Sequence, residues 1–113
     1  ELGLLEGDVD ELIEVGAYNQ FYMHRTGHWL GLDVHDVGEY KVGGQWRVFE
    51  KGMVTTVEPG LYIPKDAKNV PEAYRGIGIR IEDNVAVTRN GNDVLTDCIP
   101  KTIREIEQTM SAA

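Results

Sequence analysis

The chain of 113 residues is long enough for one domain with a hydrophobic core and too short for two. Its composition, 42% hydrophobic and 27% charged, is typical of a globular domain and argues against a disordered tail, a collagen-like fibre and a membrane protein. Nineteen acidic residues against eleven basic ones give a net charge of −8, which would repel a nucleic-acid backbone. We therefore expect neither nucleic acid nor a membrane as a partner.

The single cysteine, Cys98, excludes a framework of disulfides within the chain and favours a reducing, cytoplasmic location. The first residue is a glutamate, and residues 1–5 are typical of the last turn of a helix whose beginning is absent. We therefore expect the chain to be a piece of a longer protein.

The N-terminal part of the chain contains one helix signal followed by an irregular stretch. Asp8 is a good N-cap with Glu11 three positions on, which predicts a short helix that ends near Gly16. Residues 19–37 are rich in histidine and glycine, a pattern that favours a bent segment over a regular helix. Residues 41–45 contain two adjacent glycines and are predicted to be a surface loop.

The remaining chain is predicted to be mostly extended. The extended segments cover residues 53–57 with a continuation at 61–63, residues 76–82, residues 84–88 and residues 94–96. The first is indicated by its β-branched residues, and residues 76–82 alternate strictly at period two, with isoleucines on one face.

Short connections join these segments, and a helix ends the chain. Asn90-Gly91 is a strong tight-turn signal, and Thr102 is placed to cap an amphipathic helix with Ile103, Ile106 and Met110 on one side. Because the connections are short, we expect an antiparallel sheet and the α+β fold class.

The three histidines of the chain, His24, His28 and His35, lie within twelve residues, which suggests one site. His24 and His28 have the i, i+4 spacing of a metal-binding helix, but Arg25 stands where the zinc-protease pattern has a glutamate, so that motif is not met. Taken singly, each histidine would more often be a solvated residue or a residue satisfied in the core than part of a site.

Two carboxylates stand at constrained positions. Glu58 ends a strand and is followed by Pro59-Gly60, and Glu82 follows Arg80 on the same face of a predicted strand. Glu58 could be an exposed charge at a strand end, and Glu82 could form a surface ion pair with Arg80. Together with a histidine they would also suit a divalent cation such as Mn, Co or Zn.

Three segments of the sequence, residues 24–38, 50–63 and 76–83, resemble in order and spacing the catalytic domain of the aminopeptidase P (Xaa-Pro aminopeptidase) family, one of the pita-bread metallopeptidases. The resemblance covers essentially the whole chain. It implies the C-terminal half of a pita-bread fold, with a curved antiparallel sheet and flanking helices, across residues 1–113.

The resemblance also implies a site for two divalent metal ions, most often Mn, held by two aspartates, one histidine and two glutamates. His28 would be the histidine ligand, Glu58 a terminal ligand and Glu82 the carboxylate that bridges both ions. No position matches the two aspartates, since Asp33 and Asp36 lie inside the histidine motif. We therefore expect the aspartate-bearing half and the N-terminal domain to lie outside this chain, and at most one weakly bound ion within it.

The implied activity is removal of the residue before a penultimate proline. Glu58 would accept the proton of the attacking water, while His24 and His35 would bind the substrate carbonyl and the developing oxyanion. Tyr40 and Arg80 would shape the pocket for proline. Two alternatives are prolidase activity on Xaa-Pro dipeptides and a non-catalytic binding module, and we expect the isolated chain to be inactive and the protein to form a homo-oligomer.

Overall fold

The structure, a computed structural model, describes residues 2–112. These residues form two compact units, the first drawn from residues 2–26 and Pro59–Arg80 and the second from Gly27–Glu58 and residues 81–112. All strand pairs in the described residues are antiparallel, which together with the helices confirms the expected α+β class.

The first unit holds α1 (Val9–Glu14), the 3-10 helices η1 (Ala17–Gln20) and η2 (Glu72–Tyr74), and the strand pair β4 (Gly60–Tyr62) and β5 (Gly78–Arg80). The Asp8 carboxylate accepts hydrogen bonds from the backbone N–H groups of Asp10 and Glu11, as its sequence context predicts. Gly16 then ends α1 with a left-handed φ of 67°.

The buried core of the first unit is small. Phe21, Ile63 and Val70 form it, with partly buried residues packed around them, namely Leu4, Leu5, Leu61, Ala67 and Tyr74. The backbone N–H of Tyr62 donates to the carbonyl of Phe21 at 2.8 Å, which fixes the segment before His24 against β4. The helical turn expected over residues 1–5 is wrong for the described residues 2–5, because Gly3 adopts a left-handed φ of 67°; residue 1 lies outside them.

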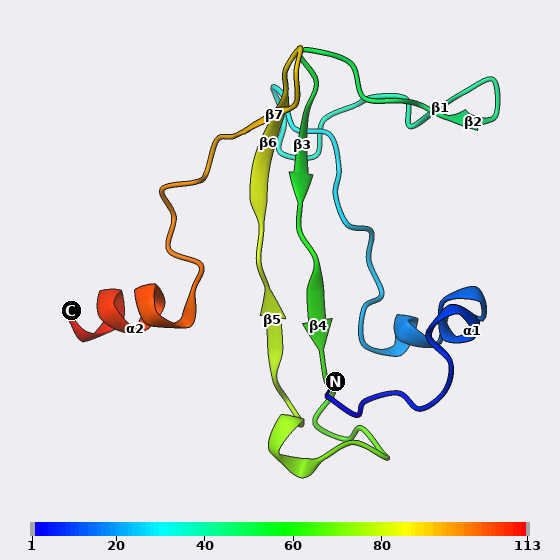
Figure 1. The fold of residues 1–113 in the computed structure, drawn as a ribbon, viewed down its shortest axis with the longest axis vertical. Coiled ribbons are helices and arrows are strands. Elements are labelled where there is room, and N and C mark those ends of the chain that lie inside the picture. Colours follow the sequence, from blue (N-terminus) through cyan, green and yellow to red (C-terminus); the bar gives the residue numbers. More distant parts are fainter. Residues whose placement is uncertain (1, 113) are drawn as a thin grey trace. The chain divides into compact units, whose positions relative to one another are not determined.

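The second unit is built on a three-stranded sheet in the order β3 (Val54–Val57), β6 (Asp83–Val87) and β7 (Asn92–Val94). Figure 1 shows β3 and β6 side by side, and Val57 pairs with Asp83 at one end of this ladder. The tight turn expected at Asn90-Gly91 joins β6 to β7.

Three extended regions differ from the sequence predictions, and the first is the return strand expected over residues 94–96, which is β7 over Asn92–Val94. The expected loop over residues 41–45 is a hairpin of β1 (Lys41–Val42) and β2 (Gln45–Trp46), because Gly43 and Gly44 both adopt positive φ and close a two-residue turn. The single strand expected over 76–82 is also wrong, since β5 ends at Arg80 and β6 begins at Asp83. Glu82 therefore lies just before a strand, not in the middle of one.

Helix α2 (Ile103–Ser111) begins with the predicted Thr102 cap. Thr102 and Glu105 form a reciprocal capping box, and the hydrogen bonds from Thr102 hold the pKa of the Glu105 carboxyl below its usual value. Within residues 2–112, α2 packs against no other named helix or strand, and its apolar residues Ile103 and Met110 are 78% and 74% exposed. None of the described helices is both long and apolar enough to cross a bilayer.

Candidate metal centre

The segment that carries His28 lies along the free edge of β3. Trp29 bridges Thr55 in antiparallel fashion, the Thr56 N–H donates to the His28 carbonyl at 2.9 Å, and the Leu30 N–H donates to the Val54 carbonyl at 3.1 Å. The backbones approach so closely that a Cβ on Gly27 would lie 2.0 Å from the Thr56 carbonyl oxygen. Glycine is therefore required at position 27 for His28 to reach this place.

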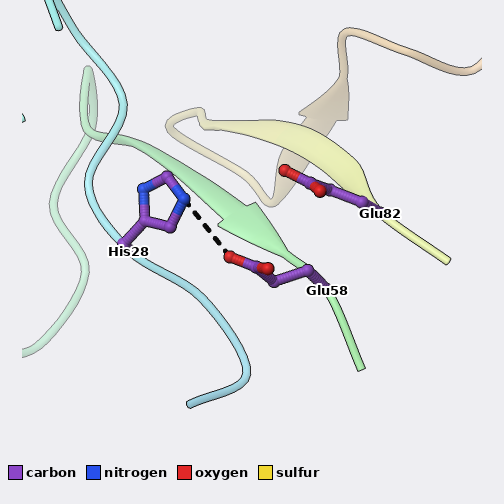
Figure 2. Close-up of side chains that lie close together, drawn as sticks. All are labelled: His28, Glu58 and Glu82. Atoms are coloured by element: carbon purple, nitrogen blue, oxygen red, sulfur yellow. Dashed lines mark ion pairs between the residues drawn. The ribbon is translucent and has the colours of Figure 1, made fainter. Parts of the chain in front are cut away.

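Three side chains gather at one end of the three-stranded sheet. Figure 2 shows His28 from the edge segment, Glu58 at the end of β3 and Glu82 just before β6. Each offers one ligand atom, and these atoms lie within 4.8 Å of one another. Glu58 is 7% exposed, His28 is half-buried and Glu82 is exposed. The structure therefore brings His28, Glu58 and Glu82 together.

The His28 ring is held so that Nε2 faces the cluster. Its Nδ1 lies 2.9 Å from the Trp29 carbonyl oxygen, and because a carbonyl can only accept, Nδ1 carries the proton. Nε2 lies 3.2 Å from Oε1 of Glu58. In a neutral ring, the Nε2 lone pair would point at a carboxylate oxygen, and a cation between the two atoms removes that repulsion. A backbone carbonyl that fixes the far nitrogen is the usual support of a metal-binding histidine.

The two glutamates face the same problem of like charge. Val57 pairs with Asp83, so Glu58 and Glu82 occupy the next positions along the two chains. Like charges opposite each other on an antiparallel pair are destabilising, and the cost rises for a buried group such as Glu58. A divalent cation would compensate both carboxylates. The donor set of one imidazole and two carboxylates therefore fits a hard or borderline divalent ion.

A second set of contacts fixes the start of β6, next to Glu82. The Asp83 carboxylate accepts a hydrogen bond from the Thr96 hydroxyl and lies 3.0 Å from Nζ of Lys101. Both contacts hold the pKa of Asp83 below its usual value, Thr96 having the larger effect. The Thr96 hydroxyl also accepts from the Asn84 N–H, so the chain after β7 is tied to the residues that follow Glu82.

His35 and Tyr40 lie in the same unit as the cluster. The His35 ring centroid is 4.3 Å from that of His28, and His35 is exposed. Tyr40 stacks on Trp29 at 5.4 Å, and its hydroxyl accepts a hydrogen bond from the Trp29 N–H at 3.2 Å. Tyr40 thus supports the segment that carries His28.

His24 and Arg80 belong to the first unit, where one tyrosine hydroxyl links them. Nε2 of His24 lies 2.7 Å from the Tyr62 hydroxyl, and Nε of Arg80 donates to the same oxygen at 2.7 Å. Nδ1 of His24 lies 2.8 Å from the Arg25 carbonyl oxygen, which can only accept, so in the tautomer with its proton on Nδ1 the Tyr62 hydroxyl donates to Nε2. His24 and Arg80 are therefore brought together through Tyr62.

Sequence reasoning missed two residues, Tyr62 and Thr56. The available sequence signal for Tyr62 was Gly60, a glycine two positions earlier on the same strand face. The structure explains this glycine, since a Cβ at position 60 would lie 2.4 Å from the Tyr62 hydroxyl. Thr56 lies two positions before Glu58 on the same strand face and donates from its hydroxyl to Glu58 Oε1 at 2.9 Å. The i, i+2 spacing was the available signal for this residue.

Comparison with known proteins places this geometry in a family. The Xaa-Pro aminopeptidase of Haemophilus influenzae is 61% identical over 98% of this chain. Among solved structures, Pseudomonas aeruginosa aminopeptidase PepP superposes on 98% of the chain with a TM-score of 0.95 and is 68% identical in sequence. A zinc-substituted Escherichia coli aminopeptidase P in complex with product also superposes on 98% of the chain, with a TM-score of 0.91 and 58% identity.

The chain spans about a quarter of the length of these relatives, 25% in the case of the Haemophilus and Pseudomonas proteins. The structural likeness confirms the expected fold, part of an α+β pita-bread domain. The sequence pattern of metallopeptidase family M24 matches residues 2–89, which include His28, Glu58 and Glu82. The chain therefore belongs to metallopeptidase family M24.

Proposed function

We propose that the full-length protein containing this chain is a metal-dependent Xaa-Pro aminopeptidase, which hydrolyses the bond between an N-terminal residue and a penultimate proline. The observation that carries the proposal is the convergence of His28, Glu58 and Glu82, with His28 Nε2 turned toward Glu58 Oε1 at 3.2 Å. The name shared by the relatives supplies the substrate class.

His28, Glu58 and Glu82 would hold the metal. We propose a complete centre of two divalent ions, with Mn expected and Co or Zn as alternatives, in which Glu82 serves both ions and two aspartates come from outside this chain. Residues 1–113 would then be the C-terminal part of the catalytic domain, and the isolated chain would hold at most one ion weakly. A divalent cation at such a site polarises the attacked carbonyl and lowers the pKa of the attacking water.

The chain's own residues would orient the substrate and move the proton. Glu58 would accept the proton of the attacking water, since its carboxylate is fixed and shielded from solvent. His35, beside His28, would donate a hydrogen bond to the oxyanion, a contact worth about 3 kcal/mol in the transition state. We propose substrate contacts for His24 and Arg80 as well, and a role for Tyr40 in shaping the proline pocket.

We also propose a cytoplasmic homo-oligomer whose partner is a peptide with proline in second position. The exposed apolar residues of α2 support an assembly in which that helix is covered, either by a second copy or by the part of the protein outside this chain.

Two other functions share this site. A prolidase would accept only Xaa-Pro dipeptides, and a non-catalytic binding module would bind peptide without turnover. Preference for the aminopeptidase rests on the relatives' names and on the presence of all three ligand residues that this chain could supply.

The test is an assay of the full-length protein with Mn on an Xaa-Pro-Xaa tripeptide, the matching Xaa-Pro dipeptide and a tripeptide with alanine in place of proline. We expect strong cleavage of the first peptide, abolished by a chelator and restored by Mn. Cleavage of the dipeptide alone would establish prolidase activity, and binding without cleavage would leave the binding module. Glu58→Gln, which keeps the side-chain shape, should bind the tripeptide without cleaving it.

A further inference from the structure

Thr56 is the most buried polar residue that the structure describes, and it contacts both His28 and Glu58. Its exposed fraction is 3%, and Glu58, at 7%, is the other buried polar residue in residues 2–112. A hydroxyl buried to this degree costs free energy unless its hydrogen bonds are made, and here they are made to two residues of the metal centre.

The direction of each hydrogen bond follows from the chemistry of the groups. The backbone N–H of His28 can only donate, and it lies 3.0 Å from Thr56 Oγ1, which therefore accepts. The carboxylate of Glu58 can only accept, and its Oε1 lies 2.9 Å from the same hydroxyl, so the single hydroxyl proton of Thr56 points at Glu58. The result is one directed chain from the His28 N–H through Thr56 to Glu58 Oε1.

The backbone of Thr56 adds a third tie. Its N–H donates to the His28 carbonyl at 2.9 Å, so the edge segment is bound to this one residue through both its main chain and its side chain. The oxygen that Thr56 holds, Oε1, is the same oxygen that lies 3.2 Å from His28 Nε2. The distance between the two ligand atoms is therefore set by contacts that pass through Thr56.

We propose that Thr56 is a positioning residue of the metal centre, which sets the spacing and orientation of the His28 and Glu58 ligands and thereby the affinity for the ion. This inference rests on the proposed function, since it takes His28 and Glu58 as metal ligands. When a contact that orients a metal-ligating side chain is removed, the affinity for the metal typically falls by about 10- to 100-fold.

The neighbouring residue Thr55 is a matched control. Among the described residues its hydroxyl donates only to backbone carbonyls, those of His28 at 2.9 Å and of Thr56 at 3.1 Å, and to no ligand side chain. Thr55→Val and Thr56→Val remove the same atom from adjacent residues of one strand. A general loss of stability in β3 would affect both variants, whereas loss of ligand positioning would affect only Thr56→Val.

The experiment uses the full-length protein, stripped of metal and titrated with Mn by calorimetry, with Co absorption as a second readout of ligand geometry. Thr56→Val should bind Mn about 10- to 100-fold more weakly and show an altered Co spectrum, while Thr55→Val stays within about threefold of the wild type. Thr56→Ser, which keeps the hydroxyl, should restore binding. If the valine variant fails to fold, Thr56→Ser and Thr56→Ala carry the test, because they differ only by the hydroxyl oxygen.

Equal Mn affinity in the wild type, Thr56→Val and Thr56→Ala would overturn the inference, as would equal losses in Thr56→Ser and Thr56→Ala, since the methyl group would then be responsible. Failure of the proposed function has a different signature. A wild type that binds Mn, responds to the Thr56 substitutions and yet cleaves no Xaa-Pro peptide would refute the function and leave the positioning role intact. A wild type that binds neither Mn nor Co would refute both.

Discussion

Gly27→Ala tests how closely the His28 segment must lie against β3. The added Cβ would lie 2.0 Å from the Thr56 carbonyl oxygen, whereas real Cβ contacts essentially never fall below 3.0 Å. The obstacle is backbone, which cannot rotate away as a side chain can. The segment must therefore move away from β3 by about 1 Å.

A movement of this size breaks the three hydrogen bonds between the segment and β3 that backbone N–H groups donate, while the Thr55 hydroxyl can turn from the His28 carbonyl to that of Thr56. They run from Thr56 N–H to the His28 carbonyl, from His28 N–H to Thr56 Oγ1 and from Leu30 N–H to the Val54 carbonyl, at 2.9, 3.0 and 3.1 Å. An added 1 Å takes each beyond hydrogen-bond distance. At about 1 kcal/mol for each bond, the expected loss in free energy of unfolding is about 3 kcal/mol. His28 would also leave Glu58, so Mn affinity should fall.

The assay is urea unfolding of the full-length protein together with Mn titration, with Gly78→Ala as control. At Gly78 the added Cβ would meet only the Tyr62 side chain, at 3.2 Å, and neither glycine has a positive φ. Gly78→Ala should cost less than about 1 kcal/mol and leave Mn affinity unchanged. If Gly27→Ala were as stable as Gly78→Ala and bound Mn normally, the close packing of the His28 segment would be refuted.

Three further predictions concern single side chains. Glu82→Gln should remove the ligand shared by both ions, so that the metal content of the full-length protein falls and peptide hydrolysis is lost; full activity would exclude Glu82 from the centre. Trp29→Phe should cost about 1 kcal/mol of stability and leave activity within a few fold, because the buried Nε1 of Trp29 has no hydrogen-bond partner among the described residues. A loss of activity equal to that of Glu82→Gln would contradict a purely structural role for Trp29. Glu105→Gln should destabilise α2 at neutral pH, because a carboxyl whose pKa is lowered in the folded state stabilises the fold when it is ionised. The difference in stability between variant and wild type should disappear as the pH falls through the lowered pKa of Glu105, and amide exchange in α2 that differs equally at pH 7 and pH 2 would contradict this.

Features that depend on neighbours in sequence could be predicted. The caps at Asp8 and Thr102 were predicted correctly because a cap is a contact between residues two or three positions apart. The strand over Val54–Val57 follows from its β-branched residues. The grouping of His28, Glu58 and Glu82 was predicted from motifs, and the antiparallel register beside Val57 and Asp83 gives its physical basis.

Features that depend on distant contacts could not be predicted. Residues 76–82 keep their alternation through Ile81, yet pairing with β4 stops at Arg80, and alternation alone does not say where a partner strand ends. Thr56 and Tyr62 look like ordinary strand residues until the His28 and His24 segments are laid beside them. One local feature is also missed: residues 41–45 are predicted to be a loop, although the adjacent glycines Gly43 and Gly44 also suit a two-residue hairpin turn.

The central claim is that His28, Glu58 and Glu82 bind one metal centre. It is tested most directly by a crystal structure of the full-length protein grown with Mn and measured for anomalous scattering. The account predicts a Mn peak within bonding distance of His28 Nε2 and of a carboxylate oxygen from each glutamate, with Thr56 Oγ1 still within hydrogen-bond distance of Glu58. A Mn peak away from these three side chains, or a His28 ring turned so that Nε2 faces elsewhere, would contradict it.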